Sequence, residues 1–277
     1  MRPGRRSSVS AHLGLAAFGL FCIAACNDPL QSGTRSPSTT PANASPAGIW
    51  SGVDSASGMQ MIGVIDAGGQ ADFFLSNGEQ FVGTAQVAGT ALAISLEGYP
   101  QFGAQFSDGS TYGVGTFNGT LASGSAINGT LSFTTSANTA ITSSWSLTFS
   151  SLYGMAETLA SVAATYADSA HSVSAGLDPL DGASVTISSN GTVFAQGAAS
   201  GCVLNGTLAA TASGVNLFAV TYSYASCSGT YFSLNGLKFS GLAYVNSADS
   251  PAQFVIAVTA QSTAGGYYGV VTDLAGS

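Results

Sequence analysis

The sequence predicts an all-β protein built from two similar antiparallel β-barrel domains in tandem, lipocalin-like or meander in type, with a short helix or turn between them. Three observations predict this fold. Apolar residues alternate with small polar ones, Asn-Gly pairs recur, and a segment of the first half reappears in the second half. Only 6% of the 277 residues are charged, against about 25% in ordinary globular proteins, which argues against helical bundles and coiled coils.

Alternation of apolar and polar residues at period two predicts strands with one buried and one solvated face. The clearest runs lie at 91–97, 144–150, 184–188, 218–224 and 254–258. Their solvated faces are expected to carry Ser, Thr and Ala in place of Lys and Glu. Asn-Gly supplies the positive φ of tight hairpins, so the following pairs are predicted as turns: Asn77-Gly78, Asn118-Gly119, Asn128-Gly129, Asn190-Gly191, Asn205-Gly206 and Asn235-Gly236.

An internal repeat predicts two barrels instead of one large sheet. Residues 64–90 align with residues 186–214, so that Gly69 matches Gly191 and Gly83 matches Gly206; the alternative is a chance match of Gly-rich β sequence. The first barrel is therefore expected at 47–150, and a short linker with the second barrel at 151–277. Residues 152–162 have helical spacing and predict a short helix or turn; alternatively, 159–166 is the first strand of the second half.

The amino-terminal segment has the form of a secretory signal. Arg2, Arg5 and Arg6 precede an apolar stretch at 13–25, which is shorter than the roughly 20 residues that span a bilayer. It ends in Ile-Ala-Ala before Cys26, which resembles the bacterial lipobox. The resemblance implies a lipoprotein signal peptide at 1–25 and a lipidated Cys26.

The residues after the signal predict a flexible tether and the membrane in which the protein is anchored. Residues 26–46 are rich in Ser, Thr and Pro, as in a flexible spacer. In enteric lipoproteins an Asp at the second mature position favours the inner membrane, whereas Asn27 stands here. The resemblance therefore implies a lipid anchor in the outer membrane of a Gram-negative cell envelope, on its periplasmic or surface face.

Charge restricts the partners of the mature chain. All 13 acidic residues follow Cys26, together with only two cations, Arg35 and Lys238. Nucleic-acid binding depends on clustered Lys and Arg, and anionic lipid head groups attract basic segments. We expect no nucleic-acid partner, and a membrane contact made through the anchor alone.

The cysteines of the folded part predict a disulfide. Cys202 and Cys227 lie nearly opposite each other across a hairpin centred on Gly214-Val215, and an exported chain favours their oxidation. The only histidine beyond the signal, His171, is expected in an exposed loop.

No feature predicts an enzyme, a cofactor or a metal site. The G-x-S-x-G and G-x-G-x-x-G patterns do not occur. Asp178 and Asp181 could offer oxygens to Ca²⁺, but further ligands are missing and a plain turn is favoured. The acids expected in turns and on the surface are Asp66, Asp72, Glu79, Glu97 and Asp108.

These features together predict a noncatalytic envelope or surface lipoprotein with a binding or structural role. The architecture and the segment FNGTLASGSAINGTLSF resemble the transferrin-binding-protein and factor-H-binding families of surface lipoproteins, which carry eight-stranded barrels on a lipid anchor. The resemblance implies a class and no partner, and no binding residue can be carried over. The partner of the protein could be another protein or a small apolar ligand. This chain lacks the Lys and Glu density of those families.

The alternative function is a lipocalin-like carrier of a small apolar ligand, because an eight-stranded barrel can hold one such molecule. Candidate lining residues are Tyr112, Phe117, Phe218, Tyr222 and Tyr224. The same aromatic side chains could instead fill the core, and this interpretation is favoured. Filled barrels would favour recognition or scaffolding, whereas a cavity of a few hundred Å³ would favour the carrier.

Overall fold

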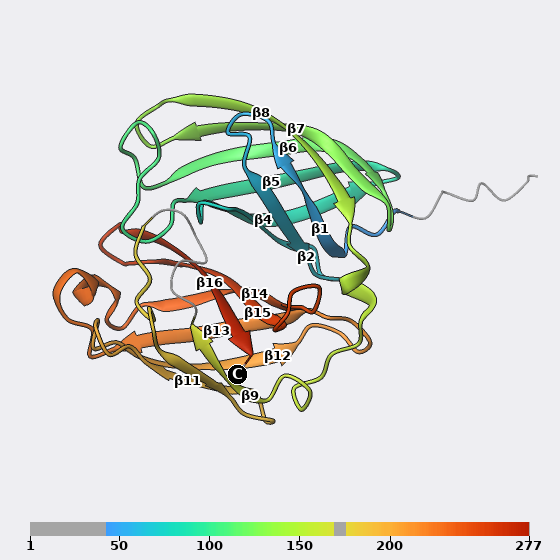
Figure 1. Cartoon of the computed structure of the whole chain (residues 1–277). Helices are drawn as coiled ribbons and strands as arrows, with labels where there is room; N and C mark the ends of the chain where they lie inside the picture. Colours follow the sequence, from blue (N-terminus) through green and yellow to red (C-terminus); the bar gives the residue numbers. More distant parts are fainter. Residues whose placement is uncertain (1–42, 169–175, 277) are drawn as a thin grey trace, which may run out of the picture. The chain divides into compact units, whose positions relative to one another are not determined.

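The computed structural model describes residues 43–168 and 176–276, which form two closed antiparallel barrels of eight strands each (Figure 1). The predicted all-β fold with two barrels in tandem is confirmed. In each barrel every strand pairs with the next, and the last pairs with the first. Cys26 and His171 lie outside the described residues. Within the described ranges, no helix has the length and apolar character needed to cross a bilayer.

The first barrel has the strands β1 (Gly48–Asp54), β2 (Gln60–Ile65), β3 (Gln70–Leu75), β4 (Gln80–Ala88), β5 (Ala91–Tyr99), β6 (Gly113–Ala122), β7 (Ala126–Thr135) and β8 (Ala140–Phe149). The second has β9 (Ala164–Asp168), β10 (Ser184–Ile187), β11 (Thr192–Gln196), β12 (Val203–Ala210), β13 (Phe218–Ala225), β14 (Lys238–Asn246), β15 (Gln253–Gln261) and β16 (Tyr267–Gly276). A 3-10 helix, η1 (Ser151–Gly154), follows β8, and another, η2 (Gly229–Leu234), follows β13. Both interpretations of the linker are thus partly right, since a helical turn comes first and a strand begins at Ala164.

The repeat seen in the sequence corresponds to the same turn in both barrels. Gly69 lies between β2 and β3 with a φ of 89°, and Gly191 lies between β10 and β11 with a φ of 85°. The carbonyl of Gly69 accepts the Ala85 N–H at 2.7 Å, and that of Gly191 accepts the Leu208 N–H at 2.7 Å. A Cβ at Gly191 would lie 2.2 Å from the Leu208 carbonyl oxygen. Both the positive φ and the close backbone therefore require glycine.

Three of the six Asn-Gly pairs lie in turns, as predicted, and three do not. Asn118-Gly119, Asn128-Gly129 and Asn205-Gly206 lie inside β6, β7 and β12, so the turn prediction is wrong for them. Gly119 and Gly129 face each other in the β6–β7 ladder. A Cβ on Gly119 would lie 2.3 Å from the Asn128 carbonyl oxygen. Close approach of two strands, and not a turn, is what requires glycine here.

Aromatic side chains fill the interior of each barrel. In the first barrel Trp145 stacks on Phe117 with ring centroids 5.1 Å apart, and both are at most 1% exposed. In the second barrel Tyr222 stacks on Phe239 at 5.3 Å, and Phe218 packs near Phe254 at 5.9 Å. Such aromatic pairs add about 0.5–1.5 kcal/mol beyond their buried area.

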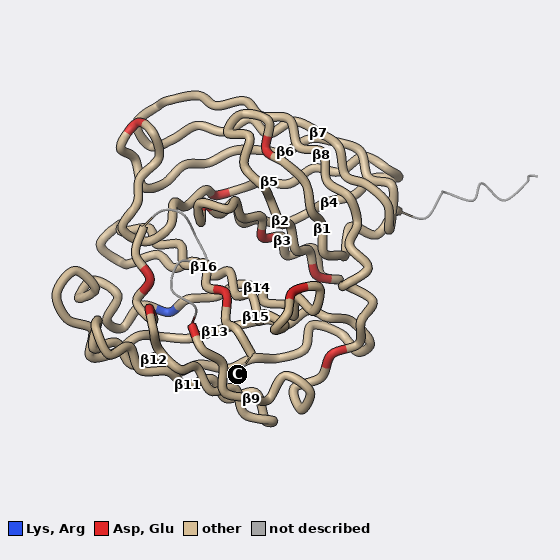
Figure 2. Tube along the Cα trace, in the orientation of Figure 1, with Lys and Arg blue, Asp and Glu red and all other residues tan. Residues whose placement is uncertain are grey.

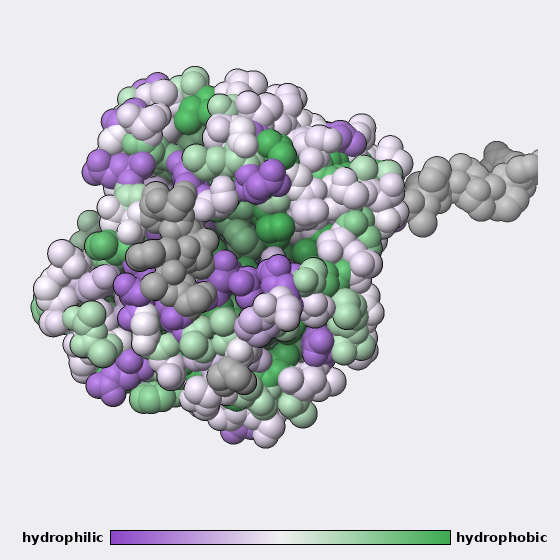
Figure 3. Space-filling model, viewed as in Figure 1, coloured by the Kyte–Doolittle hydropathy of each residue, from purple (hydrophilic) through white to green (hydrophobic). Residues whose placement is uncertain are grey.

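The two barrels also bury part of their outer faces against each other. Ile49, Val64 and Phe74 of the first barrel belong to one buried cluster with residues of the second: Leu217, Leu242, Tyr244, Val255, Ala257 and Val271. Figure 3 shows hydrophobic side chains at the base of a hollow between the barrels. The prediction of a solvated outer face is therefore wrong for these strands, because their outward residues are apolar and are buried in the contact between the barrels.

Hydrogen bonds fix the barrels next to this apolar cluster. The Gln80 side chain donates to the Val258 carbonyl at 3.3 Å, and the Gln101 side-chain oxygen accepts the Val271 N–H at 2.9 Å. The Phe102 N–H donates to the Gly269 carbonyl at 2.7 Å. These bonds satisfy buried backbone groups at a place where water is excluded.

The predicted disulfide between Cys202 and Cys227 is confirmed, with the two Cα atoms 4.0 Å apart. In the β12–β13 ladder Val203 faces Ala225, so a regular register would bring Ser226, and not Cys227, opposite Cys202. Ser226 has a φ of 60°. With its left-handed backbone, Ser226 is an extra residue between the ladder and Cys227, so that Cys227 and not Ser226 lies next to Cys202.

We expect the double change Cys202→Ala with Cys227→Ala to lower the free energy of unfolding by about 2–4 kcal/mol, because a loop of 25 residues is no longer closed in the unfolded state. Urea unfolding followed by circular dichroism measures this. The control is the wild type in reductant, which should lose a similar amount. A variant as stable as the oxidised wild type would contradict the prediction.

Candidate functional site

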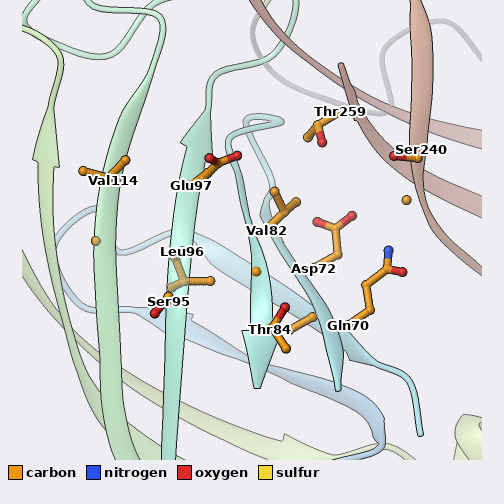
Figure 4. A pocket seen from close by; sticks show the side chains of 14 residues that line it. Gln70, Asp72, Val82, Thr84, Ser95, Leu96, Glu97, Val114, Ser240 and Thr259 are labelled. Atoms are coloured by element: carbon orange, nitrogen blue, oxygen red, sulfur yellow. The ribbon is translucent and has the colours of Figure 1, made fainter. Parts of the chain in front are cut away.

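A groove runs along the outer face of the first barrel where that face meets β14 and β15 of the second. It encloses about 550 Å³, within the range of small-molecule sites. Figure 4 shows the side chains that line it. Polar and apolar side chains at outward positions of β3 to β6 line it, among them Asp72, Val82 and Glu97, together with Ser240 and Thr259 of the second barrel.

The strand register explains which side chains reach the groove. Asp72 is paired with Val64 on one side and with Val82 on the other, and Val82 is in turn paired with Glu97. Val64 belongs to the buried contact between the barrels, whereas Val82 and Glu97 line the groove. Asp72 therefore lies at the border where the apolar contact ends and the groove begins.

Asp72 is buried without any protein partner. It is 1% exposed, and neither carboxylate oxygen has a hydrogen bond. Burial raises the pKa of this carboxyl well above its usual value. Figure 4 shows its side chain pointing from β3 toward Ser240 and Thr259. The expectation that Asp72 is a surface or turn residue is wrong. The sequence signal that could have found it is an acid within the apolar run of β3, QADFFL.

Glu97, in contrast, is held by a network from both barrels. Its carboxylate accepts Tyr99 Oη at 2.6 Å, Tyr112 Oη at 3.1 Å and the Gln261 amide at 3.1 Å. Tyr112 stacks on Tyr267 with ring centroids 3.8 Å apart. Burial, and then the bond to Glu97, raise the pKa of Tyr112 to about 12. The Glu97 carboxylate is therefore fixed in position at the side of the groove.

The charges around the groove are almost all negative. Acidic positions lie along both barrels (Figure 2), whereas the described residues contain a single Lys or Arg. That cation is Lys238, which does not line the groove. A field of one sign favours ligands of the opposite sign.

A second pocket opens at one end of the first barrel and holds about 370 Å³. Its lining combines the aromatic side chains of Phe81, Phe106 and Phe133 with polar residues, among them Asp54 and Glu79. Burial raises the pKa of Asp54, but bonds from Ser143, Ser57 and Trp145 outweigh it and lower that pKa below its usual value. Burial, and the nearby Asp54 charge, raise the pKa of Glu79.

A pair of acids lies in the second barrel. Asp168, at the end of β9, is 6% exposed and neither of its oxygens has a hydrogen-bond partner. Asp178 accepts the Leu180 N–H at 2.8 Å and Thr272 Oγ1 at 3.3 Å. Burial raises the pKa of Asp168 to about 8, helped by the charge of Asp178, and burial raises that of Asp178 to about 6.

The candidate lining residues named from the sequence lie in three places: the interior of the first barrel, the interior of the second barrel and the network around Glu97. Phe117, Phe218, Tyr222 and Tyr224 are part of the packed barrel interiors. Tyr112 lies instead at the network around Glu97, described above. The structure does not bring the five residues together in one cavity. The groove and the barrel-end pocket are formed largely by other side chains. The sequence alone does not indicate these residues, because outward positions and strand ends cannot be distinguished until the strand register is known.

Comparison of the chain with protein-family models, with curated proteins and with solved structures found no match. Among the described residues, no group of three or more His, Cys, Asp or Glu side chains is placed to hold a metal ion.

We expect stability to fall as pH rises through the region of the raised pKa values. In the unfolded chain Asp168 titrates near pH 4, whereas burial raises its folded pKa to about 8. The protonated form stabilises the fold below both values, and this contribution is lost as pH rises, at up to about 1.4 kcal/mol per pH unit.

Urea unfolding at pH 5 and pH 8 checks this prediction. Asp168→Asn should show a smaller loss of stability between these pH values than the wild type. Glu157→Gln, an acid of the linker, is the matched control and should behave like the wild type. An equal loss in Asp168→Asn and wild type would contradict it.

Proposed function

We propose that the protein is a noncatalytic, lipid-anchored lipoprotein of a Gram-negative cell envelope, which holds two β-barrels away from the outer membrane as a binding module. The observation that carries the proposal is the Ile-Ala-Ala-Cys26 sequence after a short apolar segment. The Ser/Thr/Pro-rich residues 27–46 then supply a spacer between lipid and fold. More than one acyl chain gives stable attachment.

The packed barrels support recognition on the outside of the module. Aromatic side chains occupy both interiors, with Trp50, Phe117 and Phe254 each fully buried. A ligand would therefore meet the outer faces and the groove between the barrels. The groove combines a defined volume with fixed polar groups, as binding sites generally do.

We expect Cys26→Ser to abolish incorporation of labelled palmitate and to move the protein from the membrane fraction to the soluble periplasmic fraction. Cys22→Ser is the matched control, because Cys22 lies inside the signal segment and is removed with it. That variant should keep both the label and the membrane location. Undiminished labelling of Cys26→Ser would contradict lipid attachment at this residue.

A carrier of a small apolar ligand is the second candidate function, and the pocket at the end of the first barrel favours it. Its volume of about 370 Å³ and its phenylalanine walls suit a compact apolar molecule. Ile141 lines this pocket and is only partly buried. A larger side chain there would occupy the pocket without displacing the packed core.

We expect Ile141→Trp to weaken binding of the neutral probe N-phenyl-1-naphthylamine at least fivefold, because the indole fills the space the probe would take. Fluorescence titration measures the affinity. Val53→Trp, on an outer face where the native side chain is 40% exposed, is the control and should bind as the wild type does. Equal affinity in all three proteins, or no binding to the wild type, would argue against the carrier.

A further inference from the structure

Asp72 lacks the partner that a buried carboxylate ordinarily has. Buried charges are usually paired or neutralised, yet both oxygens of Asp72 are without a hydrogen bond and the side chain is 1% exposed. No cation among the described residues is available for it, since Lys238 does not line the groove. The two carboxylate oxygens of Asp72, which have no hydrogen bond, point into the groove (Figure 4).

The second carboxylate of the groove is placed at a defined spacing from the first. Asp72, Val82 and Glu97 are consecutive partners across β3, β4 and β5. Two inter-strand spacings separate the backbones of Asp72 and Glu97 by about 10 Å. Val82 lies between the two acids and offers methyl groups to whatever connects them.

We propose that this groove binds a small linear polyamine, with one ammonium group at Asp72, another at Glu97 and the methylene chain across Val82. The proposal rests on the proposed binding function and names the ligand class for its groove.

The remaining lining suits such a ligand. Thr84, Ser95, Ser240 and Thr259 bring hydroxyl groups that can accept hydrogen bonds from ammonium. The described residues contain 12 acidic side chains and one basic one, so the surrounding field attracts cations. A linear polyamine is narrow enough to lie along a groove of about 550 Å³.

The proposed contact also predicts the direction of the pH dependence. Burial favours the neutral form of Asp72 in the free protein, whereas an ammonium partner favours the carboxylate. Binding therefore releases a proton, and affinity should rise with pH. On the strands around Asp72, from β2 to β5 and from β14 to β16, the charged side chains are Glu97, Lys238 and Asp273.

Isothermal titration with spermidine tests the proposal, on the full protein purified from membranes in neutral detergent at low ionic strength. We expect Asp72→Asn to weaken binding at least tenfold and to remove most of the rise in affinity between pH 6 and pH 8. Glu157→Gln is the matched control, because it removes the same charge from the linker. It should bind as the wild type does.

A second variant keeps the test decisive if Asp72→Asn fails to fold. Thr84 is an exposed groove residue, so Thr84→Lys adds a competing ammonium without disturbing the core, and it should also weaken binding about tenfold. Absence of spermidine binding to the wild type would overturn the proposal. So would equal weakening in Asp72→Asn and Glu157→Gln, or binding of a trilysine peptide in place of spermidine. Membrane anchoring is read separately by palmitate labelling, so failure here leaves that result intact.

Discussion

Backbone hydrogen bonds from β8 to β1 and from β16 to β9 join the ends of each sheet and close both barrels. Open sheets guard their edges with charged side chains against further strand addition. A closed sheet has no such edge, which is how a chain with only 6% charged residues can be all-β. Closure also turns one face of every strand inward, so the alternating apolar residues form one compact core in each barrel.

Closure buries only the inner face of each strand. Contact between the barrels buries part of their outer faces as well. The buried cluster around Val64 and Leu242 is formed by outward positions of both barrels. Its border passes through Asp72, where apolar packing gives way to a groove with polar side chains. A buried carboxyl without a partner destabilises the fold. Departures of this kind from the most stable arrangement are typical of functional sites.

The same contact explains why the acids differ so much from one another. Glu97 lies in the same cross-strand row as Asp72 but receives bonds from Tyr99, Tyr112 and Gln261. Gln261 belongs to β15 of the second barrel. The Glu97 carboxylate is thus held in place partly by the second barrel, whereas the Asp72 carboxylate faces the second barrel without a hydrogen bond.

The sequence by itself determined the two barrels, the repeat and the disulfide. Alternation such as that of Trp145 and Leu147 is a local property, and strand pairing within a meander follows from it. The sequence pattern did not distinguish glycines in turns from glycines required where two strands approach each other closely, such as Gly119. Only the tertiary structure decided that Asp72 is buried and that the groove exists. The physical reason is that both depend on which outer faces meet, and such a contact between distant strands leaves no periodic pattern in the chain.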